Sequence, residues 1–328
     1  MAAPTQSNNT ISTVYPLFCD EAFEGDNTIP RSPLHTITYP CTTKLDLSLD
    51  TSFEKRFDAA FVALSLSLIP TLEIIRFYNV ISPFPTNEPC APKVHLPNLR
   101  SLELIEHGSG IVALLSQLSI PTNTILDIEA SIDTTLTTSI ELIAMVGHIL
   151  EGSDGTAKQP LRTLSLMTEY GRLVINGYDY SEDSGDPELP AGLRLSLPAL
   201  NWEHRNRIVE RIAYGLPISR VETVHTDTSL LNTLHESTLK RFLWSLCSLK
   251  KVTWMDPDFP VFPSKNDKKQ RYWASCVDVR AGGESNILYS LHHMQQRIED
   301  GPYRDVVMKL LVVCVLAGFG IHDLDLRP

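Results

Sequence analysis

The six residues from Leu99 to Leu104 read Leu-Arg-Ser-Leu-Glu-Leu, and this Leu-x-x-Leu-x-Leu pattern decides how the chain folds. In a β-strand, Leu102 and Leu104 lie on one face, while the polar residues between them lie on the other. The pattern therefore predicts a short strand with one apolar and one polar face. Complete copies start at Leu72, Leu99, Leu161 and Leu249, and a weaker copy starts at Val221.

The copies recur at a nearly constant spacing. Partial copies are Leu45-x-Leu47-x-Leu49, Leu126-x-Ile128, Leu193-x-Leu195-x-Leu197 and Val277-x-Val279. Most intervals between equivalent positions lie between 24 and 29 residues. The two longer intervals contain a polar loop at Gly152–Gln159 and an acidic loop at Asp179–Glu188. A period of this size falls within the roughly 20–29 residues typical of leucine-rich repeats.

Amphipathic helices are predicted between the strands, because apolar residues recur there three and four positions apart. The first of these stretches opens with Thr51 and Glu54, which fit a capping box. The predicted stretches are 53–68, 111–118, 140–150, 208–216, 239–246 and 287–294.

Strand and helix thus alternate along nearly the whole chain. One such pair cannot bury its apolar faces alone, whereas stacked pairs share a continuous core. We predict one α/β domain over 31–328: an irregular leucine-rich-repeat solenoid with short parallel strands on the concave face and helices on the convex face. Residues 1–30 are expected to be loosely ordered, with a short strand or turn at Val14–Phe18. A doubly wound fold would also alternate, but no Gly-rich loop follows a strand.

Composition limits the classes of partner. The net charge is −11 and the chain has no Lys/Arg-rich run, which disfavours nucleic acid and an anionic membrane surface. The six cysteines form no Cys-x-x-Cys motif, as expected for free thiols in a reducing compartment. The start lacks a signal peptide, and the apolar run Val306–Ile321 is too short to span a bilayer. We expect a cytoplasmic or nuclear protein.

No motif points to catalysis, a cofactor or a metal. No phosphate-binding or dinucleotide-binding fingerprint occurs. Gly108–Gly110 is expected to form a turn rather than a nucleophile elbow. Adjacent helical residues point about 100° apart, so His292 and His293 make a poor shared metal site. We therefore expect no enzyme. An enzyme on an α/β sheet stays open as the other class, and it would require a deep pocket with clustered acids or histidines.

The segment Ile69–Ser131 resembles the repeat region of the large family of basidiomycete F-box proteins. The resemblance is carried by Leu96–Leu104 and by Leu114–Pro121, a helix end followed by Thr124-x-Leu126-x-Ile128. Weaker matches are Leu243–Trp254 and the segment 288–297, the latter followed by an expected strand at Val307–Val313. The resemblance implies the substrate-recognition part of a cullin-type ubiquitin ligase.

The chain departs from that family at the F-box. An F-box opens with Leu-Pro-x-Glu and carries a Trp in its last helix. None of the four Leu-Pro pairs here is followed by x-Glu, and no Trp precedes Trp202. Two hypotheses stay open: an adaptor whose F-box lies upstream and docks the ligase, or a free-standing repeat scaffold.

We predict that the chain binds a target protein through the concave face. The residues that flank the inward leucines point outward, and they are short, polar or charged, which suits a solvated binding face. They are Arg76, Ser101, Glu103, Thr163, Ser165, Thr223, His225, Lys251 and Thr253.

Overall fold

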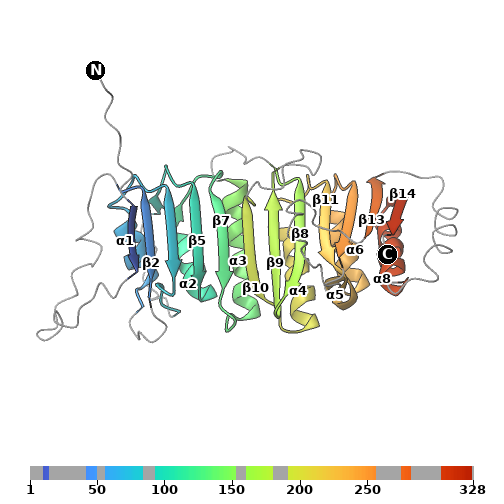
Figure 1. The fold of residues 1–328 in the computed structure, drawn as a ribbon, viewed down its shortest axis with the longest axis horizontal. Helices are drawn as coiled ribbons and strands as arrows, with labels where there is room; N and C mark the ends of the chain where they lie inside the picture. The colour runs from blue at the N-terminus through green and yellow to red at the C-terminus, as the bar shows by residue number, and fades with distance from the viewer. Residues whose placement is uncertain are drawn as a thin grey trace, which may run out of the picture. The chain divides into compact units, whose positions relative to one another are not determined.

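The computed structural model describes residues 10–14, 42–49, 56–83, 93–152, 160–179, 191–255, 275–281 and 304–326. The chain divides into two compact units, unit 1 over 1–145 and unit 2 over 146–328, where the sequence predicts one repeat domain over 31–328. The division falls within helix α3 (Leu136–Glu151). Each unit is a layer of strands with helices on one face (Figure 1).

Unit 1 contains a parallel sheet in the order β1-β2-β3-β5-β7. Its strands are β1 (Thr10–Val14), β2 (Lys44–Ser48), β3 (Ile74–Tyr78), β5 (Ser101–Glu106) and β7 (Ile125–Ala130). The helices α1 (Ala59–Leu66) and α2 (Gly108–Gln117) precede β3 and β7. A separate short pair joins β4 (Val94–His95) to β6 (Leu118–Ser119).

Apolar rows in register form the core of unit 1. Leu45, Ile75, Leu102 and Leu126 lie side by side across four strands, and each is at most 1% exposed. Phe77, Leu104 and Ile128 form the next row and are fully buried. Each such side chain contributes roughly 1.5–3 kcal/mol by leaving water. The predicted alternation of the leucine pattern is therefore present in this unit.

Two local predictions for unit 1 are wrong, one about where the first helix begins and one about the conformation of Gly108–Gly110. The first helix begins at Ala59, because Asp58 is its N-cap and accepts a hydrogen bond from Ala60 N at 2.8 Å. Phe57 lies before the helix, in a β-bridge with Ile81. The predicted cap at Thr51 lies outside the described residues. The Gly108–Gly110 stretch, predicted as a turn, is the first turn of α2. A short N-terminal strand covers Thr10–Val14, and of the strand or turn predicted at Val14–Phe18 only Val14 lies within the described residues.

Unit 2 contains strands in the order β10-β9-β8-β11-β12-β13-β14. They are β8 (Thr163–Glu169), β9 (Arg172–Tyr178), β10 (Leu193–Pro198), β11 (Thr223–Asp227), β12 (Lys251–Met255), β13 (Ser275–Ala281) and β14 (Phe319–Leu326). Its helices are the C-terminal part of α3 with α4 (Trp202–Gly215), α5 (Thr228–Thr233), α6 (Glu236–Ser245) and α8 (Arg304–Leu316). The predicted helix at 287–294 lies outside the described residues.

The prediction that all strands are parallel is wrong in unit 2. β8, β11 and β12 are parallel, but β9 runs antiparallel to β8 and β10, and β13 runs antiparallel to β12 and β14. β8 and β9 are joined by a tight hairpin at Tyr170 and Gly171, whose φ angles are 48° and 77°. Positive φ at both turn residues suits the right-handed twist of a two-residue hairpin.

The prediction of a strand at Val307–Val313 is also wrong, since these residues lie inside α8. Its buried residues include Val307, Leu310, Leu311 and Cys314, spaced three, four and seven positions from the first, together with Val313. That spacing is helical. Gly318, at φ 84°, follows the helix and leads into β14. The described fold is thus mixed α/β with mostly parallel strands.

Candidate functional site

Three rows of side chains cross the strands of unit 1 on the face opposite its apolar core. The register sets them side by side on β2, β3, β5 and β7. We call them the outward rows of unit 1, and all are partly exposed or exposed. The rows are Lys44, Ile74, Ser101 and Ile125; Asp46, Arg76, Glu103 and Asp127; and Ser48, Tyr78, Ile105 and Glu129.

Arg76 forms ion pairs with its neighbours on both sides in the central row of Asp46, Arg76, Glu103 and Asp127. Its Nε lies 3.0 Å from Glu103 Oε2 on β5, and its Nη1 lies 3.9 Å from Asp46 Oδ2 on β2. Lys44 Nζ lies 4.0 Å from the same Asp46 oxygen. The Arg76 side chain is 41% exposed, so each ion pair contributes at most about 1 kcal/mol to stability. The consequence is positional, because three neighbouring strands hold one guanidinium in place.

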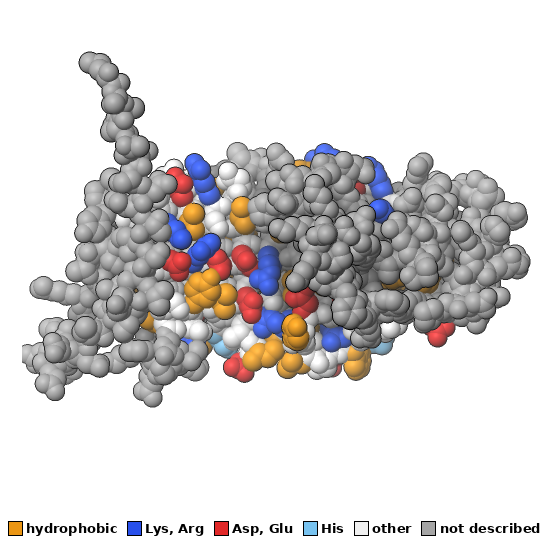
Figure 2. All heavy atoms as spheres, viewed as in Figure 1, with side chains coloured by type: hydrophobic (Ala, Val, Ile, Leu, Met, Phe, Trp, Pro, Cys, Tyr) orange, Lys and Arg blue, Asp and Glu red, His pale blue; other side chains and the backbone are white. Residues whose placement is uncertain are grey.

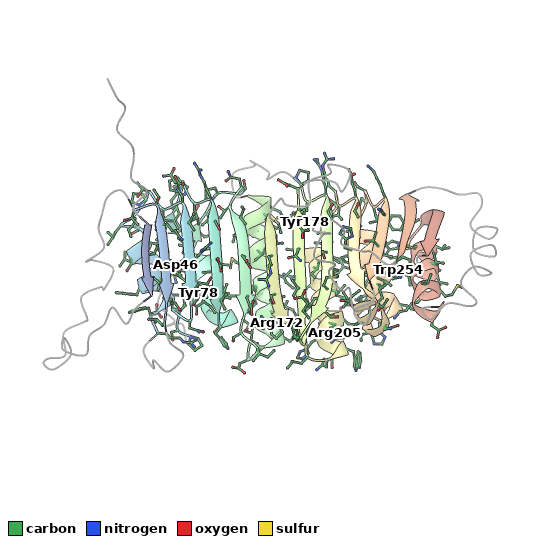
Figure 3. The ribbon with its side chains drawn as sticks, viewed as in Figure 1. Asp46, Tyr78, Arg172, Tyr178, Arg205 and Trp254 are labelled. Atoms are coloured by element: carbon green, nitrogen blue, oxygen red, sulfur yellow. The ribbon has the colours of Figure 1, made fainter. Side chains whose placement is uncertain are left out.

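Tyr78 adds a hydrogen bond to the same network. Its hydroxyl donates to Glu103 Oε1. This bond to the Glu103 carboxylate, followed by partial burial, raises the pKa of Tyr78 to about 12, although Arg76 opposes the shift. The phenol therefore stays neutral at physiological pH and orients Glu103 toward Arg76. Figure 3 labels Asp46 and Tyr78 on the strands of unit 1.

The outward rows mix charge with aliphatic surface. Ile74, Ile105 and Ile125 are half-buried, in contrast to the fully buried isoleucine Ile75 of the core. Figure 2 shows Lys/Arg and Asp/Glu side chains beside hydrophobic ones on the strand-side face. Arg, Tyr and aliphatic groups set together are the chemistry of protein–protein contact surfaces.

Three of the predicted binding residues, Arg76, Ser101 and Glu103, lie on the outward rows of unit 1. Sequence reasoning missed Asp46 and Tyr78, which complete the network. A signal for Asp46 existed, since it lies between two leucines of the triplet Leu45-x-Leu47-x-Leu49. Tyr78 follows the last apolar residue of its Leu-x-x-Leu-x-Leu copy, so the pattern made no prediction for its side chain.

The other six predicted residues lie in unit 2, in two rows set by the register of β8, β11 and β12. Lys251 is partly exposed. The expectation of a solvated face is wrong for the remaining five, because each is at most 6% exposed. These five are Thr163, Ser165, Thr223, His225 and Thr253. Their role in binding a partner stays a prediction.

Hydrogen bonds between neighbours accompany this burial. His225 Nδ1 is hydrogen-bonded to Thr253 Oγ1 across β11 and β12. The Thr253 hydroxyl also lies 3.5 Å from the carbonyl of Val224. A hydroxyl can be buried at small cost when it finds one partner, whereas a charged side chain cannot. Short hydroxyl residues at these positions are thus compatible with either a wet or a covered face.

A carboxylate closes the end of a strand in each unit. Glu106 ends β5 and accepts hydrogen bonds from Val80 N at 2.5 Å and Ile81 N at 3.2 Å. It is 1% exposed, and burial raises its pKa to about 7 against the opposing hydrogen bonds and the charge of Arg56. Asp227 ends β11, accepts from Thr168 and caps α5 through Leu230 N at 2.5 Å. Both carboxylates satisfy backbone donors, which is a structural role.

Unit 2 also has an open groove of about 850 Å³, lined by residues of α4, α8 and the turn between α5 and α6. Trp202 and His235 meet edge to face on its wall, with ring centres 5.1 Å apart. Lys309 Nζ donates to the carbonyls of Leu231, at 2.9 Å, and Leu234, which end α5. Burial lowers the pKa of Lys309. The amine therefore has a helix-capping role.

In the part of the chain that the structure describes, no three His, Cys, Asp or Glu side chains are grouped so that they could hold a metal ion. The histidines at 292 and 293 lie outside that part of the chain. None of the described helices is long and apolar enough to cross a bilayer.

No family model and no curated protein matches the chain. Among solved structures, the chain is similar to the leucine-rich repeat-containing protein LegL7 from Legionella pneumophila. The two share 10% sequence identity over 70% of this chain and 88% of that chain, with a TM-score of 0.22.

Proposed function

We propose that this chain is a non-catalytic protein-binding module of the leucine-rich-repeat solenoid type, and that the outward rows of unit 1 contact its target. The observation that carries the proposal is the network of Arg76, Asp46, Glu103 and Tyr78, fixed across three strands beside half-exposed isoleucines. A surface held in place before binding loses little conformational entropy when a partner docks. Binding residues on rigid strands are also better positioned than those on loops.

The proposal is tested by affinity capture with the full chain and two matched variants. Arg76→Glu reverses the central charge of the outward rows of unit 1. Arg220→Glu makes the same change at an exposed position in a turn of unit 2. We expect a set of captured proteins to be lost with Arg76→Glu and retained with Arg220→Glu, while thermal unfolding shows that both variants are folded. The proposal fails if both variants retain the same proteins.

A narrower version assigns the module to a ubiquitin-ligase adaptor, and it rests on the sequence resemblance of Ile69–Ser131 alone. In that case an F-box encoded upstream would dock the ligase. Mapping the 5′ end of the native transcript tests it directly. An upstream exon that encodes Leu-Pro-x-Glu and a following Trp would support the adaptor. Translation from Met1 would leave a free-standing repeat scaffold.

A further inference from the structure

Two large aromatic side chains are exposed on the helix layer of unit 2. Tyr214 near the end of α4 is 71% exposed, and Trp244 near the end of α6 is 56% exposed. α4 and α6 pack against each other, and both lie on the helix side of the strands (Figure 1). Single exposed apolar residues are common on monomers. Tyr and Trp together with Arg, however, are the residues that dominate binding energy at interfaces.

Helical spacing places basic side chains with these aromatic rings. Arg207 is seven residues before Tyr214, so the two lie on one face of α4. Lys240 is four residues before Trp244, and its Nζ lies 4.6 Å from the Trp244 ring centre. This cation–π contact orients the indole while leaving more than half of it in water. We call Arg207, Tyr214, Lys240, Arg241 and Trp244 the aromatic-basic surface.

The platform beneath these side chains is rigid. Arg241 Nη1 lies 3.0 Å from Glu210 Oε1 and links α6 to α4. On its other side α4 approaches α3 so closely that a Cβ on Gly147 would lie 1.6 Å from the carbonyl oxygen of Gly215. The ion pair and this close approach both restrict movement of α4 relative to its neighbours. The aromatic-basic surface is therefore preorganised.

The local charge is opposite in sign to that of the whole chain. The chain carries −11, but α4 and α6 together contain five Lys/Arg and three Glu residues. From Arg207 onward in α4 and from Lys240 onward in α6, the one carboxylate is Glu210, and Arg241 already pairs with it. A basic patch on an acidic protein steers acidic partners to that patch.

We propose that the aromatic-basic surface docks an acidic segment of a partner protein, in which apolar side chains alternate with carboxylates. The apolar groups pack on Tyr214 and Trp244, and the carboxylates meet Arg207 and Lys240. This surface is independent of the outward rows of unit 1. Each unit therefore has a candidate contact surface, and the two surfaces differ in chemistry.

The test uses the full chain and two fluorescent peptides of equal length, one built from Glu-Glu-Phe repeats and one from Lys-Lys-Phe repeats. Fluorescence anisotropy should show the Glu peptide binding at least about tenfold more tightly, with the difference shrinking as salt rises. Trp244→Ala and Arg207→Glu should each weaken binding of the Glu peptide by about tenfold. Arg100→Glu, at an exposed position of unit 1 outside the outward rows, is the matched control and should have no effect.

Several results would overturn the proposal. These are equal affinity for the two peptides, no binding of the Glu peptide, or equal loss with Arg100→Glu. Binding to anionic vesicles that Trp244→Ala abolishes, without peptide binding, would assign the surface to a lipid headgroup layer. A dimer that dissociates in Trp244→Ala would assign it to a second copy. Tyr214→Ala serves as a further variant if Trp244→Ala does not fold, and thermal unfolding checks each variant.

Discussion

The outward rows of unit 1 and those of unit 2 arise from the same strand alternation but meet different surroundings. In unit 1, the Arg76 side chain is 41% exposed and pairs with carboxylates on two neighbouring strands. In unit 2, the equivalent rows contain His225 and Thr253, which are 5% and 1% exposed. The two-residue alternation of a strand therefore decides on which face of the sheet a side chain lies. It does not decide whether that face is exposed to solvent.

The residue types in the rows distinguish the exposed rows of unit 1 from the buried rows of unit 2. The central row of unit 1 consists of Asp, Arg, Glu and Asp, and burying such groups would cost several kcal/mol each unless they were fully paired. The rows of unit 2 are mainly Thr, Ser and His, which tolerate burial with a single hydrogen bond. A charged outward row is thus a stronger sequence indication of an exposed face than a hydroxyl row.

The largest change in the free energy of unfolding should come from exchanging charged and hydroxyl side chains between the rows of the two units. Thr253→Arg places a charge at a buried position of unit 2 and is expected to lower the free energy of unfolding by about 5 kcal/mol, or to prevent folding. Arg76→Thr, the reverse change in unit 1, should cost less than about 1 kcal/mol, because it removes only exposed ion pairs.

Urea unfolding measures both effects. Every tryptophan of the chain lies at or after Trp202, so tryptophan fluorescence reports on unit 2 and circular dichroism covers both units. If Thr253→Arg costs no more than Arg76→Thr, the rows of unit 2 are open to solvent and the contrast between the two units disappears.

The sequence predicted much of the fold because one pattern reports directly on burial. Each complete or weak Leu-x-x-Leu-x-Leu copy coincides with a strand, namely β3, β5, β8, β11 and β12. The pattern could not predict β9, because the run Leu173-Val174-Ile175 lacks it. Nor could it predict strand direction, because the spacing of apolar residues carries no information on direction. The continuous apolar run in α8 has no clear period of two or of 3.6, so strand and helix could not be separated there.

The candidate site was predicted less completely. The pattern placed Arg76 and Glu103 on the outward face, since both lie between inward apolar residues. It did not indicate that they pair, because pairing depends on the register between strands that lie 27 residues apart in the sequence. Burial of Thr163 and Thr253 was also hidden, because it depends on the surroundings of the sheet in the folded chain rather than on local spacing.

The next largest change in the free energy of unfolding is expected at the carboxylates that end a strand in each unit. Asp227→Ala in unit 2 removes the acceptor of Thr168 N and Leu230 N. One buried and one partly buried donor without partners should lower the free energy of unfolding by about 3 kcal/mol. Asp227→Asn keeps one acceptor oxygen and should recover part of this loss. Equal losses for Ala and Asn would mean that the hydrogen bonds do not carry the stabilisation.

Glu106, the counterpart in unit 1, should make stability depend on pH. Its pKa is raised to about 7 in the folded chain, so between its ordinary value and 7 the native state holds a proton that the unfolded state has lost. Stability therefore falls as pH rises through this window. Relative to Glu106→Gln, the wild type should lose up to about 3 kcal/mol between about pH 5 and about pH 8.

The measurement is the free energy of unfolding by urea, followed by circular dichroism, for both proteins at both pH values. Subtracting the variant removes the titration of all other groups. A difference that does not change with pH would show that the Glu106 carboxyl titrates normally, and hence that water reaches the turn at Val80 and Ile81.

The smallest effect is spectroscopic and concerns the network in the outward rows of unit 1. The hydrogen bond to Glu103 raises the pKa of Tyr78 to about 12. Glu103→Gln removes the negative charge and should return that pKa toward 10, the value of a free tyrosine. Phenolate absorbance of each protein, minus that of the matching protein with Tyr78→Phe, isolates this titration among ten tyrosines. An unchanged Tyr78 pKa in Glu103→Gln would mean that Glu103 does not hold the phenol, and the preorganised network proposed for binding would lose its central contact.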